Sequence, residues 1–280
     1  MKIGVSVPTV VGAPVDVAAL AREAEELGFD SIWVPEHPIM PVNVASPFPQ
    51  GGPIPESYSH MMDPFVALAR ASAVTSTLKL GTGVCLVPER NPLLLAKVIA
   101  TLDHYSGGRF LFGIGAGWNK EETELMGGNF AHRWTQTREA VLAMKELWTK
   151  DEAEYHGTYY DFPPVRSLPK PVQKPHPPVI LGGMARNVLQ RVATWGDGWM
   201  PNRVTPEQMK ASRAKLDELA TAAGRDPESI EITIFGRSPD KKEIKAYEDA
   251  GAERAVVRLS GESTDDALAD LEKIARQVLN

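Results

Sequence analysis

The strongest constraint on the fold is a regular alternation of short apolar segments with longer helical ones. Eight segments of strand length occur along the chain, and a segment with helical periodicity or helix caps follows each of them. The expected strands are residues 2–7, 31–34, 78–87, 110–114, 179–181, 198–200, 231–235 and 253–259. Such alternation indicates a parallel sheet, and eight units in 280 residues predict an α/β fold, a single (β/α)8 TIM-like barrel over residues 1–280.

An open, doubly wound sheet is the alternative architecture. We favour the barrel because no glycine-rich turn follows the first strand to anchor a doubly wound sheet. Two irregular stretches interrupt the alternation, residues 35–63 and residues 155–178. The first is rich in Pro, Gly and Ser, and we expect it to be an insertion loop that shapes a substrate pocket, since long loops in compact domains are usually functional.

Composition narrows the classes of partner. The net charge of −6 gives no support for binding to nucleic acid or to an anionic membrane. No apolar stretch approaches the roughly 20 residues of a membrane span, and the first residues lack the pattern of a signal peptide. The single cysteine, Cys85, rules out an intrachain disulfide and fits a reducing compartment, so we expect a cytoplasmic protein.

The stretch Gly107–Glu122, GGRFLFGIGAGWNKEE, indicates a strand, then bare backbone, then a helix start. Asn119 and Glu122 have the spacing of a capping box. Glycines at the end of a strand let a ligand approach the main chain, and a helix amino terminus favours negative charge. The stretch is not the G-x-G-x-x-G dinucleotide motif, because Trp118 stands where the third glycine should be. A tight turn against a crowded barrel wall is the simpler alternative.

Functional residues of such a barrel lie at the carboxyl ends of its strands. These positions hold Glu36, His37, Gly83, Val84, Gly115, Ala116, Gly117, Trp118, Gly182, Gly183, Met184, Asn202 and Arg203. They offer no cluster of metal ligands and no paired carboxylates, so a hydrolytic metal site is not expected. Glycines with Met184, Trp118 and Trp199, and few charges, suit a large flat cofactor that carries the chemistry itself.

His37 is the candidate for proton transfer, although a histidine that only bonds a neighbouring loop is the alternative. The pair Gly182–Gly183 before a helix is a candidate phosphate cradle, with Arg186 or Arg203 as counter-charge; a plain glycine turn is the alternative. Glu121 and Glu122 are expected only to complement the amino terminus of a helix.

Taken together, these features resemble the luciferase-like monooxygenase superfamily, and within it the oxidoreductases that depend on the deazaflavin coenzyme F420. The resemblance covers nearly the whole chain. It is carried by AREAEELGFDSIWVPEH (21–37), DPFVALARASAVTSTLKLGTGVCLVPERNPLLLAK (63–97), TLDHYSGGRFLFGIGAGWNKEE (101–122), KPVQKPHPPVILGG (170–183) and GDGW (196–199).

The resemblance implies a bacterial-luciferase-like barrel with a flavin or deazaflavin at its carboxyl end. It implies a non-prolyl cis peptide at Gly83–Val84, which would press on the ring. It places Gly115 to Trp118 beside the ring, the phosphate near Gly182 to Ala185, and His37 at the reactive side. In one respect the chain departs from the pattern: sugar-phosphate dehydrogenases of the family have a glutamate where Trp118 stands. A more apolar substrate is therefore expected, and His37 and Glu36 are the candidate acids.

Three functions remain open from the sequence. The first is hydride transfer to or from a small, largely apolar substrate with F420. The second is an FMN-dependent monooxygenase that is fed by a separate reductase, and the third is a cofactor-binding carrier without catalysis. Relatives are commonly homodimers that pair through the helices here around residues 66–74 and 95–102, so a homodimer is expected.

Overall fold

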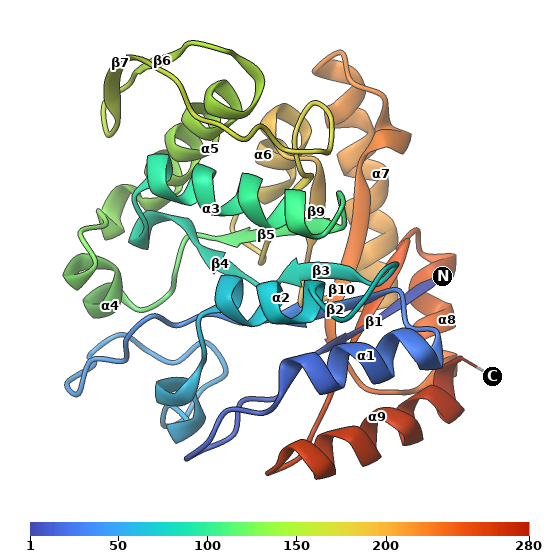
Figure 1. The fold of residues 1–280 in the computed structure, drawn as a ribbon. Coiled ribbons are helices and arrows are strands. Elements are labelled where there is room, and N and C mark those ends of the chain that lie inside the picture. Colours follow the sequence, from blue (N-terminus) through green and yellow to red (C-terminus); the bar gives the residue numbers. More distant parts are fainter. Residues whose placement is uncertain (280) are drawn as a thin grey trace.

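The computed structural model describes residues 1–279, and within them eight parallel strands close into a barrel (Figure 1). The sheet order is β3-β2-β1-β11-β10-β9-β8-β5, and pairing of β3 with β5 closes the ring. The strands are β1 (Lys2–Ser6), β2 (Ser31–Val34), β3 (Lys79–Thr82), β5 (Phe110–Gly115), β8 (Val179–Gly182), β9 (Gly198–Met200), β10 (Glu231–Arg237) and β11 (Arg254–Arg258). The predicted TIM-like barrel is therefore confirmed, and the open sheet is excluded.

Helices surround the barrel, as Figure 1 shows. They are α1 (Val17–Leu27), α2 (Pro64–Ser72), α3 (Pro92–Tyr105), α4 (Lys120–Leu125), α5 (Arg133–Thr149), α6 (Val188–Trp195), α7 (Pro206–Ala222), α8 (Lys241–Asp249) and α9 (Thr264–Val278). Short 3-10 turns are η1 (Glu56–His60), η2 (Val87–Glu89), η3 (Phe130–His132) and η4 (Pro227–Ser229). Many start at a side-chain cap: the Asp16 carboxylate, for example, accepts hydrogen bonds from the first backbone N–H groups of α1.

The structure differs from the sequence expectations at two places. The third strand is not continuous over residues 78–87, because it breaks at a cis peptide between Gly83 and Val84 and resumes as the short β4 (Cys85–Leu86). The stretch 155–178 is not wholly irregular, since its start joins the antiparallel hairpin of β6 (Ala153–His156) and β7 (Asp161–Val165). The sequence did not predict this hairpin, because most of its positions are exposed and too polar to give the pattern of a strand.

The interior of the barrel is filled by large side chains that leave little room beside the strands. Trp33, Leu111, Ile180, Met200 and Val256 form this inner cluster. Gly81 lies directly under the ring of Trp33, since a Cβ there would be 2.3 Å from that ring. A Cβ on Gly113 would lie only 2.0 Å from the carbonyl oxygen of Thr82. Close strand packing below the mouth therefore depends on glycine.

Replacement of Gly113 by Ala tests this crowding. The added methyl would collide with the Thr82 carbonyl and approach the Met200 methyl to 2.9 Å, so we expect a loss of about 3 kcal/mol or more in the free energy of unfolding. Gly127→Ala is the matched control: its φ of +85° is strained for Ala, but nothing lies within 4 Å, and about 1–2 kcal/mol is expected. Urea denaturation measures both, and equal losses would contradict steric crowding at Gly113.

Candidate active site

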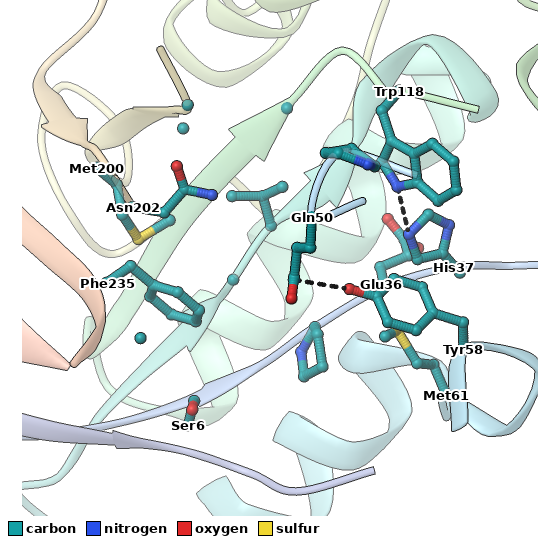
Figure 2. Close-up of a pocket in the computed structure, with 18 of the residues that line it drawn as sticks. Ser6, Glu36, His37, Gln50, Tyr58, Met61, Trp118, Met200, Asn202 and Phe235 are labelled. Carbon is teal, nitrogen blue, oxygen red and sulfur yellow. Dashed lines mark hydrogen bonds between the residues drawn. The ribbon is translucent and has the colours of Figure 1, made fainter. Parts of the chain in front are cut away.

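A cavity of about 1130 Å³ lies at the carboxyl ends of the barrel strands. Every barrel strand or the turn after it contributes to its wall, from Ser6 at β1 to Arg258 at β11. Figure 2 shows His37, Tyr58 and Trp118 on one side of it and Met200, Asn202 and Phe235 on the other. The structure brings together all of the residues expected at the site: Glu36, His37, Gly83, Val84, Gly115, Ala116, Gly117, Trp118, Gly182, Gly183, Met184 and Ala185.

The cis peptide at Gly83–Val84 lies in the floor of this cavity, at the position that the resemblance implied. The Val84 side chain fits between two neighbouring strands. A Cβ on Gly115 or on Gly182 would lie 2.7 Å from a methyl of Val84. These two glycines thus provide the space in which Val84 projects from the floor, where a flat ring can rest on it.

His37 is held from both sides of its ring. Its Nδ1 lies 2.6 Å from Oε2 of Glu122, and the indole N–H of Trp118 donates to its Nε2 at 3.2 Å. Because an indole nitrogen is only a donor, Nε2 must be the acceptor, and the neutral ring carries its proton on Nδ1 and donates it to the Glu122 carboxylate. The assignment follows from the hydrogen-bond network. Nε2 is then the atom of His37 that can take a proton from a substrate.

The hydrogen bonds of Glu36 indicate a structural role rather than the catalytic role that was expected for it. Its carboxylate accepts from the backbone N–H of Leu86 at 2.7 Å and from Nε of Arg90 at 2.7 Å. Arg90 also donates to Asp63 at 2.7 Å. Both oxygens of Glu36 are therefore engaged in fixing the turn after β3. Proton transfer by Glu36 stays a prediction, one that this arrangement does not favour.

The sequence analysis missed Glu122 as a site residue. Asn119 does cap α4 by accepting from the N–H of Glu122 at 3.2 Å, but the Glu122 side chain binds His37 rather than completing a capping box. No local signal reveals this bond, because the two residues are 85 positions apart. Glu121 was also underestimated, since its carboxylate accepts from Ala45 N–H and Ser46 Oγ and so fastens the insertion loop to α4.

The insertion loop forms an aromatic wall around His37. Tyr58 and Phe48 come from this loop, and their rings contact each other and the ring of Trp118. The ring centroids of His37 and Tyr58 are 5.2 Å apart. Burial raises the pKa of the Tyr58 hydroxyl, against the opposing charges of Arg258 and Arg203, so Tyr58 remains a neutral hydrogen-bond donor. Substrate near His37 would therefore meet mostly apolar surface.

The expectation of few charges at the mouth was wrong. Four arginines line the cavity, Arg133, Arg203, Arg237 and Arg258, whereas Arg186 is exposed and outside it. Trp199 is not in the wall either: it is fully buried, and its N–H donates to the carbonyl of Gly183 at 3.0 Å, which supports the Gly182–Gly183 turn.

Arg133 and Arg191 form a basic pair that has no acidic partner within residues 1–279. Arg133 donates to the carbonyl of Gly117 at 3.1 Å, and Arg191 stacks on the ring of Trp134. Burial lowers the pKa of both guanidinium groups, and the charge of Arg133 adds to this effect at Arg191. Nη1 of Arg191 is buried without a hydrogen-bond partner among the described residues. This pair is suited to an anion, and the sequence alone did not single it out.

Among residues 1–279, no group of three or more His, Cys, Asp or Glu side chains is arranged to hold a metal ion. In the same part of the chain, no helix is both long and apolar enough to cross a membrane.

A family model described as luciferase-like monooxygenase matches residues 1–268. An uncharacterised protein of Mycobacterium tuberculosis is 38% identical over 270 residues, which cover 93% of each chain. The F420-dependent glucose-6-phosphate dehydrogenase of Amycolatopsis mediterranei is 28% identical over 255 residues, 89% of this chain and 72% of the relative. The FMNH2-dependent dimethylsulfone monooxygenase of Pseudomonas putida is 31% identical over 150 residues, 51% and 40% of the two chains.

The fold is shared with a solved structure, that of the monooxygenase RslO1 from Streptomyces bottropensis. The TM-score is 0.80 at 23% identity, and the match covers 100% of this chain and 99% of that chain.

The assigned tautomer of His37 can be tested by nitrogen NMR of histidine-labelled protein at a pH where the ring is neutral. We expect a protonated Nδ1 and an unprotonated Nε2, since Trp118 donates to Nε2. Trp118→Phe removes that donor and should allow a population with the proton on Nε2. Trp134→Phe is the control, because Trp134 stacks on Arg191 instead. A wild-type ring protonated mainly on Nε2 would contradict the assignment.

Proposed function

The chain belongs to the luciferase-like monooxygenase family, and on that premise we propose that it is an oxidoreductase that uses coenzyme F420 to transfer a hydride to or from a small, largely apolar organic substrate. The observation that carries the proposal is the placement of His37 and the Gly83–Val84 floor in one cavity. A proton-transfer group thus faces a surface on which a flat ring can lie.

The residues present fit such a cofactor. In the proposed arrangement the ring rests on Val84 and runs beside the backbone of Gly115 to Trp118, where glycines leave the main chain accessible. Its phosphate lies near Gly182 to Ala185. Gly183 has a φ of +89° and open space where a Cβ would be, and the guanidinium group of Arg133, which lines the same cavity, supplies positive charge for an anion.

The protein's own part in the chemistry is proton transfer and exclusion of water. When bound, F420 supplies the site that accepts or gives the hydride. Substrate displaces the indole N–H of Trp118 from Nε2 of His37. Nε2 then takes the hydroxyl proton of an alcohol as it is oxidised, or returns that proton to the oxygen of a carbonyl as it is reduced. The Glu122 carboxylate, bound to Nδ1, stabilises the protonated ring.

The nature of the substrate follows from the surroundings of His37. The rings of Tyr58 and Trp118 contact the imidazole, and Met61 also lines this part of the cavity (Figure 2). Phe48 packs against both of these rings. This surface supports a largely apolar substrate. The arginines of the mouth are available to the charged parts of the cofactor or to an acidic group that the substrate carries.

A reductase-fed FMN-dependent monooxygenase is the second candidate. It is favoured by the FMNH2-dependent relative, which matches about half of this chain, whereas the F420-dependent relative matches 89% of it. A cofactor-binding carrier is the non-enzymatic alternative. The expected homodimer and the separate reductase stay predictions; Val66 on α2 and Leu94 on α3 are each 66% exposed, which supports pairing through these helices.

The cofactor can be identified by titration of the ligand-free protein with oxidised F420 and, separately, with FMN, followed by fluorescence and calorimetry. We expect micromolar or tighter binding of F420 and a clear preference over FMN. Arg133→Gln should weaken F420 binding by about tenfold, since an anion in the cavity would lose a charged donor. Arg276→Gln is the control, because Arg276 is exposed on α9 and pairs with Glu272.

Preference for FMN, together with oxygen consumption, would replace the proposal by the monooxygenase. Binding of neither cofactor would overturn the assignment of the cavity.

The role of His37 can be tested by turnover. His37→Asn should lower the rate with small secondary alcohols and ketones by about 10²-fold or more, because Asn cannot exchange a proton. The coenzyme's absorbance reports the reaction, and His104→Asn on the outer surface of α3 is the control. Full activity of the His37 variant would remove the assigned role, and tight binding without turnover in the wild type would favour the carrier.

A further inference from the structure

Two buried glutamates lie behind the cavity wall: Glu122 binds His37, and Glu89 binds Thr123, the residue that follows Glu122. Glu89, in η2, is 3% exposed and Glu122, in α4, is fully buried. Oε1 of Glu89 accepts from the Thr123 hydroxyl at 2.9 Å, and it lies just behind the wall, since a Cβ on Gly117 would be 3.1 Å from it. One oxygen on each carboxyl, Oε2 of Glu89 and Oε1 of Glu122, has no partner among the described residues.

The charges around these carboxyls do not balance if both are ionised. Arg90 is a cation that acts on Glu89, but its hydrogen bonds go to Glu36 and Asp63 rather than to Glu89. Two like charges in one buried site disfavour double ionisation, so one carboxyl retains its proton. Glu122 is the ionised member, because it accepts the Nδ1 proton of His37. Glu89, whose carboxyl receives within residues 1–279 a hydrogen bond from a hydroxyl alone, is left as the protonated one.

The electrostatics agree with this geometry. Burial raises the pKa of Glu89 to about 8, and the charge of Glu122 is the next contribution. Glu36 acts in the same direction, while Arg90 and the Thr123 hydroxyl oppose it. These are the charged and hydrogen-bonding groups that act on Glu89 from the end of β2, from η2 and from α4.

We propose that Glu89 is a positioning residue that is kept protonated behind Gly117, and that its neutral carboxyl sets the proton affinity of the His37–Glu122 pair. While Glu89 is neutral, the charge of Glu122 is the one negative charge of this pair that acts on His37. When Glu89 loses its proton to solvent, a second negative charge lies beside Glu122, and the protonated imidazole becomes more favourable. His37 then releases a proton less readily.

The catalytic consequence rests on the proposed function, but the protonation state does not. Infrared difference spectra of the ligand-free wild-type protein can be recorded from roughly pH 6.5 to roughly pH 9.5, a range that brackets the Glu89 transition. They should show the loss of a protonated carboxyl band as the pH rises. Glu89→Gln should abolish that band and keep the fold, because an amide resembles a neutral carboxyl in shape. Glu139→Gln, at a buried glutamate that binds the Tyr159 N–H, should keep the band.

The link to His37 is tested by NMR titration of its ring in the same proteins. Wild type and Glu139→Gln should show a second inflection at the pH where the carboxyl band disappears, in the direction of a more protonated ring. Glu89→Gln should show no such inflection, whereas a merely structural Glu89 would give no inflection in any of them. The pH profile of turnover should lose the same inflection in Glu89→Gln.

Stability gives an independent check with a defined sign. The pKa of Glu89 is raised in the folded state from 4.5 to about 8, so its favourable contribution is present below 4.5 and is lost as pH rises towards 8. The melting temperature of Glu89→Gln relative to wild type should therefore rise across this interval and level off above it.

Absence of a protonated carboxyl band in the wild type would overturn the inference, as would a band that persists in Glu89→Gln. If that variant does not fold, the wild-type spectra and ring titration still decide. Failure of F420 and FMN binding with the band present would remove the proposed function alone, so the two failures are distinguishable.

Discussion

The mouth of this barrel depends on a steric constraint among three neighbouring strands. Val84 projects into the cavity from the cis peptide after β3, and it has room only because Gly115 on β5 and Gly182 on β8 lack side chains. Below this level, Gly113 lets β5 approach the Thr82 carbonyl. A barrel brings the carboxyl ends of its strands together around one opening. These glycines leave room for Val84 to project into that opening, where a planar molecule can rest on it.

A second group of contacts fixes the position of His37 at the carboxyl ends of the strands. The insertion loop is fastened by Glu121 to the start of α4, and it brings Phe48 and Tyr58 against Trp118. Trp118 and Glu122 in turn hold the two nitrogens of His37. His37 is thus fixed in one tautomer within apolar surroundings, which exclude water and strengthen its electrostatic interactions.

The charged residues around the cavity are also unevenly distributed. The chain has a net charge of −6, yet the charges along the cavity wall are mainly those of arginines. Glu36 also lines the cavity, but its charge is paired with Arg90, and Glu122 lies behind the wall against His37. A planar cofactor with an anionic end would meet both an apolar surface for its ring and arginine side chains for its negative charge in this one cavity.

The sequence by itself determined the barrel and the set of residues at its rim. Strand and helix periodicities are local properties, and the carboxyl-end rule converts strand ends into candidate positions such as His37, Trp118 and Gly182. The residues that support those positions could not be found in this way. Glu122 looked like a helix cap, Glu36 like an acid and Trp199 like a wall residue, because each has a plausible local role.

Only the tertiary structure decided their partners. Glu122 meets His37 across 85 positions, and Arg90 reaches back to Glu36 across 54. Such contacts arise from the closure of the barrel, which brings together segments that share no local pattern. The chain's local chemistry fixes where strands end, whereas long-range packing fixes which side chain faces which, and therefore which carboxyl is paired and which is left to hold a proton.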